Sequence, residues 1–263
     1  MPAAAEDLAL ALELADVADS ITLARFRAAD LVVETKPDLT PVSEADTAVE
    51  RALRDRLGAV RPADSILGEE YGVSEGSDAG RRWIVDPIDG TKNYVRGIPV
   101  WATLLALQEG DRATIGVVSA PALGRRWWAA RGTGAFGVDG LSNGPRRLAV
   151  SGVRALEDAQ LVVSGFDGWE ERGRLDGLLS LARRCWRTRG FGDFWTYMLI
   201  AEGVADIGCE AVVSLWDLAA PQVIVEEAGG TFTDLGGVAT PDGGDALATN
   251  GLLHAEALGI VGR

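Results

Sequence analysis

The chain has 263 residues, of which 47% are hydrophobic and 24% are charged, and its formal net charge is −14. This is the composition of an ordinary soluble globular protein that is long enough to bury a full core. The negative charge argues against nucleic acid or an anionic membrane as a partner, and no apolar run approaches the roughly 20 residues that span a bilayer. Only two cysteines are present and no basic leader precedes the first apolar segment, so we expect a reduced, cytoplasmic setting.

The first part of the chain, residues 1–150, is predicted to be α+β. Apolar residues at helical spacing indicate an amphipathic helix over 6–27. The segment Ser43-Glu-Ala-Asp46 has the form of a capping box and opens a second helix through about Leu57. A short Ile-Leu strand then leads into Glu69 and Glu70. Further β-rich runs, separated by turns, are expected at 83–85, 101–107, 114–120 and 126–130.

The second part, residues 151–263, has a different pattern in which strands and helices alternate. Strands are expected at 161–164 and 205–209, and helices at 175–184, 194–202, 217–227 and from about 252. This alternation favours an α/β layer. We therefore predict an α/β protein with an α+β first half, and we place a boundary near residue 150.

The most informative segment is Trp83-Ile-Val-Asp86-Pro-Ile-Asp89-Gly-Thr91. A buried strand ends here at a proline, and two carboxylates three residues apart lie on either side of the break. Mg²⁺ favours such hard oxygen ligands when it binds a phosphate. Asp, Pro and Gly are also ordinary turn formers, so the metal interpretation depends on partner carboxylates elsewhere in the chain.

Four other acidic residues are candidate partners. Glu69 and Glu70 end a neighbouring strand, which would place their carboxylates near the same cation. Asp217, in Trp216-Asp217-Leu-Ala-Ala-Pro221, is a third candidate, although it also suits a helix N-cap with Pro221 in the first turn. Asp46 is ambiguous in the same way between capping and metal binding. Both interpretations stay open for each aspartate.

The only histidine, His254, is expected at an exposed position of the last helix. A phosphohistidine enzyme, a Ser-His-Asp triad and a His-ligated zinc site are therefore disfavoured. The chemistry is expected to use carboxylates, hydroxyls and metal. Bound divalent cations would also reconcile the acidic chain with a phosphate substrate, and the N–H groups of Gly90 and Thr91 are placed to begin a helical turn that faces a phosphate.

Three blocks resemble the inositol-monophosphatase-like family of Mg²⁺-dependent, lithium-sensitive phosphatases. They are Gly68-Glu69-Glu70, Trp83 to Thr91, and Trp216-Asp217-Leu-Ala-Ala through Glu227-Ala-Gly-Gly230. The first helix and the segment from Lys36 to Asp46 also fit in order and spacing, so the resemblance covers nearly the whole chain. It implies a layered α-β-α-β-α sandwich, a homodimer and a small phosphate monoester as substrate.

The resemblance also implies roles for individual residues. Two or three Mg²⁺, with Mn²⁺ or Zn²⁺ as alternatives, would be bound by Glu69, Asp86, the carbonyl of Ile88, Asp89 and Asp217, with Asp46 at a weaker third site. Thr91 and Glu69 would orient the attacking water. The substrate would be bound by Asp89, Gly90, Thr91, Arg189, Gly192, Asp193, Glu210 and Asp217. Residues 1–150 would hold most metal ligands, and residues 151–263 the last ligand and the specificity residues.

The choice of substrate depends on Arg189-Gly-Phe-Gly192-Asp193, where inositol-type members have small residues. This segment resembles the histidinol-phosphate phosphatase branch of the family. Carboxylates suit the ammonium and imidazole groups of histidinol phosphate, so Asp193 and Glu210 would hold these groups. Arg189 would position the phosphate side or brace Asp193, and Asp193 would alternatively be a helix N-cap.

The expected function is therefore the Mg²⁺-dependent hydrolysis of L-histidinol phosphate in histidine biosynthesis. The alternative is a phosphatase for inositol 1-phosphate or another small polyol phosphate. The rival from another class is a non-catalytic regulatory module. All the matching carboxylates and Thr91 are present, which favours a catalytic protein.

Overall fold

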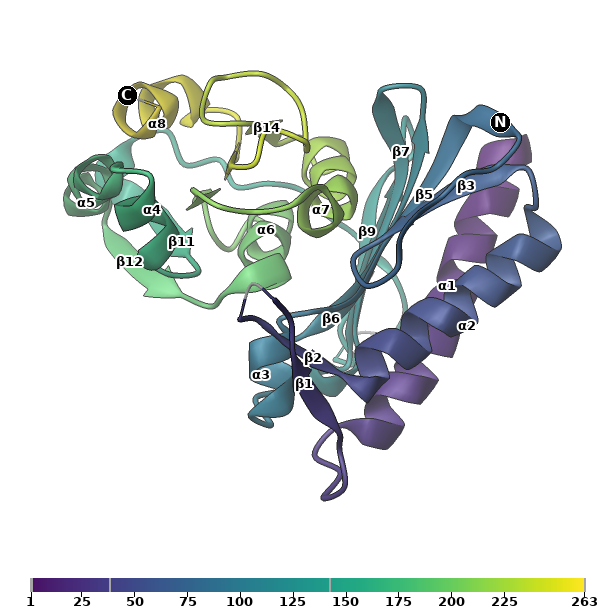
Figure 1. The fold of residues 1–263 in the computed structure, drawn as a ribbon. Helices are drawn as coiled ribbons and strands as arrows, with labels where there is room; N and C mark the ends of the chain where they lie inside the picture. The colour runs from purple at the N-terminus through teal and green to yellow at the C-terminus, as the bar shows by residue number, and fades with distance from the viewer. Residues whose placement is uncertain (1, 38, 142, 263) are drawn as a thin grey trace.

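The structure of the chain, a computed structural model that describes residues 2–37, 39–141 and 143–262, contains two large β-sheets and the helices that cover them (Figure 1). The helices are α1 (Pro2–Arg25), α2 (Glu44–Val60), α3 (Thr91–Val95), α4 (Asp167–Glu171), α5 (Leu175–Arg184), α6 (Asp193–Ala201), α7 (Leu215–Glu227) and α8 (His254–Val261), with 3₁₀ turns at Pro121–Leu123 and Leu156–Asp158. None of the described helices is long and apolar enough to cross a membrane.

The larger sheet has the strand order β10-β9-β8-β7-β6-β5-β3-β4. Its strands are β3 (Asp64–Gly68), β4 (Gly72–Ser74), β5 (Asp78–Asp89), β6 (Ala102–Glu109), β7 (Arg112–Ala120), β8 (Arg125–Ala130), β9 (Gly134–Val138) and β10 (Arg146–Arg147). The pairing of β3 with β5 is parallel, whereas the other pairs in this sheet are antiparallel. A separate hairpin is formed by β1 (Val33–Thr35) and β2 (Pro41–Ser43).

The smaller sheet has the order β12-β11-β13-β15-β14. Its strands are β11 (Gln160–Val163), β12 (Arg187–Gly190), β13 (Ile207–Glu210), β14 (Thr231–Thr233) and β15 (Ala246–Thr249). Strand β11 is parallel to both of its neighbours, and the remaining pairs are antiparallel.

These elements form five layers (Figure 1). Helices α1 and α2 cover one face of the larger sheet, and α7 packs on the other face together with α6. The smaller sheet follows, with α5 and α8 on its far side. Side chains alternate along β5 between the two faces: Trp83 and Val85 face the α1–α2 core, and Ile84 faces the α6–α7 core.

Each predicted half contains one sheet, because the larger sheet lies within residues 64–147 and the smaller within 160–249. The core between the sheets includes side chains from both halves, for example Leu104 and Val223. A division into two domains near residue 150 therefore stays a prediction. The helices predicted from the sequence all occur, and their ends lie within a few residues of the predicted ones.

The expectation that His254 is exposed was wrong. Its side chain is buried because the two ring nitrogens lie 3.0 Å and 3.1 Å from the hydroxyls of Thr233 and Thr249, which belong to neighbouring strands of the smaller sheet. Burial lowers the pKa of His254. This histidine is therefore a structural link between α8 and the sheet.

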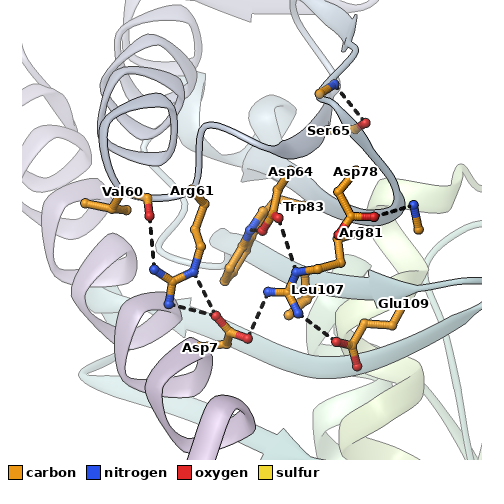
Figure 2. Close-up of polar contacts among 12 residues, drawn as sticks. Asp7, Val60, Arg61, Asp64, Ser65, Asp78, Arg81, Trp83, Leu107 and Glu109 are labelled. Atoms are coloured by element: carbon orange, nitrogen blue, oxygen red, sulfur yellow. Dashed lines mark hydrogen bonds and ion pairs between the residues drawn. The ribbon is translucent and has the colours of Figure 1, made fainter.

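An ion-pair network fixes the N-terminal end of α1 to the larger sheet (Figure 2). Asp7 accepts hydrogen bonds from Arg61, which follows α2, and from Arg81 in β5. Arg81 also pairs with Asp64 and Glu109, at the ends of β3 and β6. The Asp7 side chain is only 5% exposed, so a neutral replacement would leave two arginines with weaker partners.

We predict that Asp7→Asn lowers the free energy of unfolding by about 1–3 kcal/mol without changing the site, because a buried charged hydrogen-bond acceptor is lost. Urea unfolding measures this. Glu13→Gln is the matched control: it removes an exposed pair with Arg56 and should cost less than about 1 kcal/mol. Equal losses in the two variants would contradict the role assigned to the buried network.

Candidate active site

A pocket of about 700 Å³ opens where β3 and β5 end. Six segments line it: the start of β2, the end of β3, the junction of β5 with α3, the end of β11, the junction of β12 with α6, and the stretch from 212 to the start of α7. Because β3 and β5 are parallel, their carboxyl ends meet at the same edge of the sheet, and the N–H of Glu69 donates to the carbonyl of Val85. The sequence-predicted convergence of these two strand ends is therefore present.

A β-bulge places Asp86 and Asp89 on the same side of β5. In a regular strand, residues three apart point to opposite faces. Here Asp86 pairs with Leu104 and Asp89 pairs with Ala102, so β5 has one more residue than β6 over this stretch. The carbonyl of Pro87, inside the bulge, accepts a hydrogen bond of 2.7 Å from the Thr103 hydroxyl.

Asp217 completes a cluster with Asp86 and Asp89. One ligand oxygen from each of the three lies within 4.8 Å of the others. Asp217 is not the N-cap of α7: the cap is Ser214, and Asp217 occupies the third position of the capping box, where its Oδ2 accepts from the Ser214 N–H at 2.8 Å. Pro221 lies beyond the first turn, and since it has no N–H, the Asp217 carbonyl has no normal i+4 donor.

The protein holds this cluster against electrostatic repulsion. Burial raises the pKa of Asp86 and Asp89 well above the ordinary value, and neighbouring carboxylates raise both further. Burial also raises the pKa of Asp217 to about 6. One oxygen of Asp86 is buried with no hydrogen-bond partner among the described residues. Clustered acceptors with an unused buried oxygen fit a divalent cation, which favours the ionised carboxylates.

Thr91 and Asp46 lie beside this cluster. The Thr91 hydroxyl is 3.1 Å from Asp46 Oδ1 and 2.9 Å from the Ile88 carbonyl oxygen. The other Asp46 oxygen accepts from the backbone N–H and the hydroxyl of Ser43 and so completes the capping box of α2. Asp46 therefore caps a helix and also contacts Thr91. Burial raises its pKa.

Glu69 and Glu70 share a lysine in this structure. Lys36, in the turn between β1 and β2, places its ammonium 2.8 Å from Glu69 and 2.7 Å from Glu70. Glu69 lines the pocket, and Glu70 does not. Burial raises the pKa of Glu70 to about 7. The ammonium partly neutralises the acidic edge of the site.

The opposite wall of the pocket is formed by the start of α6. Asp193 Oδ2 accepts a hydrogen bond from Asn93 at 2.9 Å, and the Asp193 N–H donates to the Ser164 hydroxyl. Asp193 is the first residue of α6, after the N-cap Gly192, and the Phe194 N–H is capped by Asp89 at 2.6 Å. Asp89 thus connects the acidic cluster to the helix that holds Asp193.

Glu210 and Arg189 do not line this pocket. Glu210, with Ser164, lines a smaller adjoining cavity and accepts from the Tyr197 hydroxyl at 2.6 Å. Burial raises the pKa of Glu210 to about 7. Arg189 is exposed, donates to the Thr188 carbonyl and does not line the pocket, although the next residue, Gly190, does.

Sequence reasoning did not assign roles to Lys36, Asn93, Ser164 or Tyr197. None of the four lies in a local sequence pattern that indicates a role. The acidic residues to which they are hydrogen-bonded lie between 13 and 100 positions away in the sequence. The one available signal was the position of Lys36, which lies within a segment that resembles the family.

The five layers and the carboxylates at the sheet edge define a class, and the chain belongs to the inositol monophosphatase family, whose model matches residues 4–261. Two relatives are named histidinol-phosphatase. The one from Streptomyces coelicolor is 56% identical over 265 residues, which cover 99% of this chain and 98% of the relative. The one from Mycobacterium tuberculosis is 57% identical over 254 residues, which cover 96% of each.

Solved structures agree with the fold. The extragenic suppressor protein suhB from Bartonella henselae has a TM-score of 0.88 at 28% identity, with 97% of this chain and 98% of that chain covered. These comparisons confirm the predicted family and the predicted sandwich. The family is metal-dependent, in agreement with the acidic cluster.

We predict that Asp86→Asn stabilises the metal-free protein, and increasingly so as the pH rises. Carboxyl groups with raised pKa values keep protons in the folded state that the unfolded chain has already released. Stability is therefore lost as the pH rises from about 4 through the folded pKa values, which reach about 6 for Asp217 and about 7 for Glu210. Mg²⁺ should reverse this loss in the wild type.

Thermal melting at pH 5 and pH 8, with EDTA or with Mg²⁺, measures both effects. The Mg²⁺-induced rise in melting temperature should be larger at pH 8 and should largely disappear in Asp86→Asn. An equal rise in wild type and variant would contradict a cation site at Asp86.

Proposed function

We propose that this chain hydrolyses L-histidinol phosphate to L-histidinol and phosphate in histidine biosynthesis, with Mg²⁺ as the metal. The observation that carries the proposal is the presence of two sets of carboxylates in the pocket and in the smaller cavity that adjoins it. One set, Asp86, Asp89 and Asp217, suits cations that bind phosphate. The other, Asp193 and Glu210, suits the cationic groups of the substrate. The relatives named histidinol-phosphatase, at 56% and 57% identity, support the same substrate.

In this proposal, two or three Mg²⁺ are held by Glu69, Asp86, the Ile88 carbonyl, Asp89 and Asp217, with Asp46 at the weakest site. Bound divalent cations neutralise phosphate charge, stabilise the leaving alkoxide and lower the pKa of a water molecule. Glu69 would have to exchange Lys36 for a cation, and this is possible because the lysine comes from a hairpin turn at the rim.

The residues around the phosphate have complementary tasks. The first N–H groups of α3 have no partner within the helix, and Gly90 and Thr91 line the pocket, so their N–H groups can bind phosphate oxygens. The proton of the Thr91 hydroxyl is directed to Asp46 or to the Ile88 carbonyl. Its lone pairs are then free to accept a hydrogen bond from the attacking water, which Glu69 would orient from the other side.

The substrate amine and ring would lie against Asp193 and Glu210, beside Gly192. Arg189 is proposed to act from the rim, on the phosphate side or as a brace for Asp193, after its guanidinium leaves the Thr188 carbonyl. The homodimer also stays a proposal, which sedimentation tests directly.

We predict a strong preference for histidinol phosphate over inositol 1-phosphate, because inositol has no cation to meet the second set of carboxylates. Phosphate release from both substrates, measured side by side with Mg²⁺ and with EDTA, checks this. A preference for inositol 1-phosphate would contradict the substrate but retain the metal mechanism, whereas no release from either would favour a regulatory module.

We also predict that Asp89→Asn lowers kcat at least about 100-fold on either substrate, because the site loses a charged metal ligand. Asparagine keeps an oxygen that accepts from the Phe194 N–H, so the circular dichroism spectrum and urea midpoint should change little. A folded variant with the wild-type rate would refute Asp89 as a metal ligand.

A further inference from the structure

Asp193 and Glu210, the two carboxylates proposed to bind the substrate cations, have unusual hydrogen-bond partners. Asp193 and Glu210 are bonded to Asn93, Ser164 and Tyr197, which are all uncharged. Among residues 2–37, 39–141 and 143–262, no lysine, arginine or histidine forms an ion pair with either of them. Burial raises the pKa of Asp193, and Lys92, which forms no ion pair with it, only partly offsets that rise.

Several other acids with little solvent exposure are neutralised by the chain. Asp7, Glu50 and Glu202, for example, are each paired with an arginine. Neutral partners orient a carboxyl group without placing a fixed positive charge beside it, so the position that an external cation would take next to Asp193 and Glu210 is left open. A lysine or arginine in the place of Asn93 or Tyr197 would occupy the position that a ligand ammonium needs.

The backbone of Asp193 is also held in an uncommon conformation. Its φ is +50°, in the left-handed region that non-glycine residues rarely adopt. Two contacts fix it there, from its N–H to Ser164 and from Asn93 to its Oδ2. The carboxylate also lies close to Gly90, where a β-carbon would approach Asp193 Oδ2 to 3.1 Å. Strain that is held in place at a site indicates a functional constraint.

Asn93 connects the wall that carries Asp193 to the phosphate end of the pocket. It lies in α3, two residues after Thr91, and its single amide nitrogen donates to the Val100 carbonyl and to Asp193, both at 2.9 Å. Ser164 connects the backbone of Asp193 to the carboxylate of Glu210, since its hydroxyl accepts from the Asp193 N–H and bonds to Glu210. The neutral groups therefore form one chain from α3 to β13.

We propose that Asn93, Ser164 and Tyr197 are positioning residues that hold Asp193 and Glu210 as an unneutralised pair for the ammonium and imidazole of the substrate. They act through the two carboxylates and do not touch the reacting atoms. The inference rests on the proposed function, because it assumes a cationic substrate. It assigns the substrate preference to the hydrogen-bond donors as well as to the acids themselves.

The test is Asn93→Ala, assayed on histidinol phosphate and on p-nitrophenyl phosphate, which has no cation. Loss of a hydrogen bond to a charged group should lower kcat/KM for histidinol phosphate about 10- to 100-fold, mainly through KM. For p-nitrophenyl phosphate, the change should stay within about 3-fold. Ser164→Ala should show the same selective loss.

Two controls separate positioning from a merely structural role. Asn250 is a buried asparagine whose amide donates to Val153 and Ser151 in a region that does not line the pocket. Asn250→Ala should lower the melting temperature without altering the ratio of the two kcat/KM values. In an Asp193→Asn background, Asn93→Ala should cause no further loss of preference, because coupled residues are not additive.

The outcomes distinguish the two proposals. A wild-type enzyme without preference for histidinol phosphate would overturn the proposed function and this inference together. Two other outcomes would overturn this inference alone. One is a clear wild-type preference that is retained in Asn93→Ala. The other is a double variant in which the selective losses of Asp193→Asn and Asn93→Ala add.

Discussion

Asp86, Asp89 and Asp217 repel one another, and the rest of the structure holds them together in spite of this. Their oxygens lie within 4.8 Å, and burial, with the charges of nearby carboxylates, opposes their ionisation. The strand that carries two of them cannot slip to relieve the repulsion. Trp83 and Val85 are packed in one core and Ile84 in another, so a shift by one residue would exchange the two faces. The third, Asp217, is fixed by its own capping box.

Hydrogen bonds also join the cluster of Asp86, Asp89 and Asp217 to the wall of the pocket that carries Asp193. Asp89 caps α6 through the Phe194 N–H, and Asn93 of α3 holds Asp193 of α6. The two sets of carboxylates are therefore linked through the starts of α3 and α6, although these helices come from different halves of the chain. A substrate with phosphate at one end and cations at the other would meet two sites whose separation is fixed by these contacts. The difference between family members can then arise at a few positions on α3, β12 and α6, while the metal site is retained.

Much of the fold and the acidic cluster could be predicted because the signals are local. The capping box at Ser43 and Asp46 and the helix at 175–184 depend on residues close together in sequence, and both are present. Other features depend on distant contacts. The bulge that turns Asp86 and Asp89 to one side is defined by β6. The burial of His254 is defined by Thr233 and Thr249. The bond from Asn93 to Asp193 joins residues 100 positions apart, and no local pattern contains it.

The most direct test of the account is a crystal structure with Mn²⁺ and L-histidinol, in which anomalous scattering locates the metal. We predict Mn²⁺ peaks bounded by Asp86, Asp89 and Asp217, with Glu69 released from Lys36. We also predict the L-histidinol ammonium or ring against Asp193 and Glu210, with the bond from Asn93 to Asp193 intact. Mn²⁺ bound elsewhere, or L-histidinol bound away from these two carboxylates, would contradict the assignment of the two sets of acids to phosphate-binding cations and to the substrate cation.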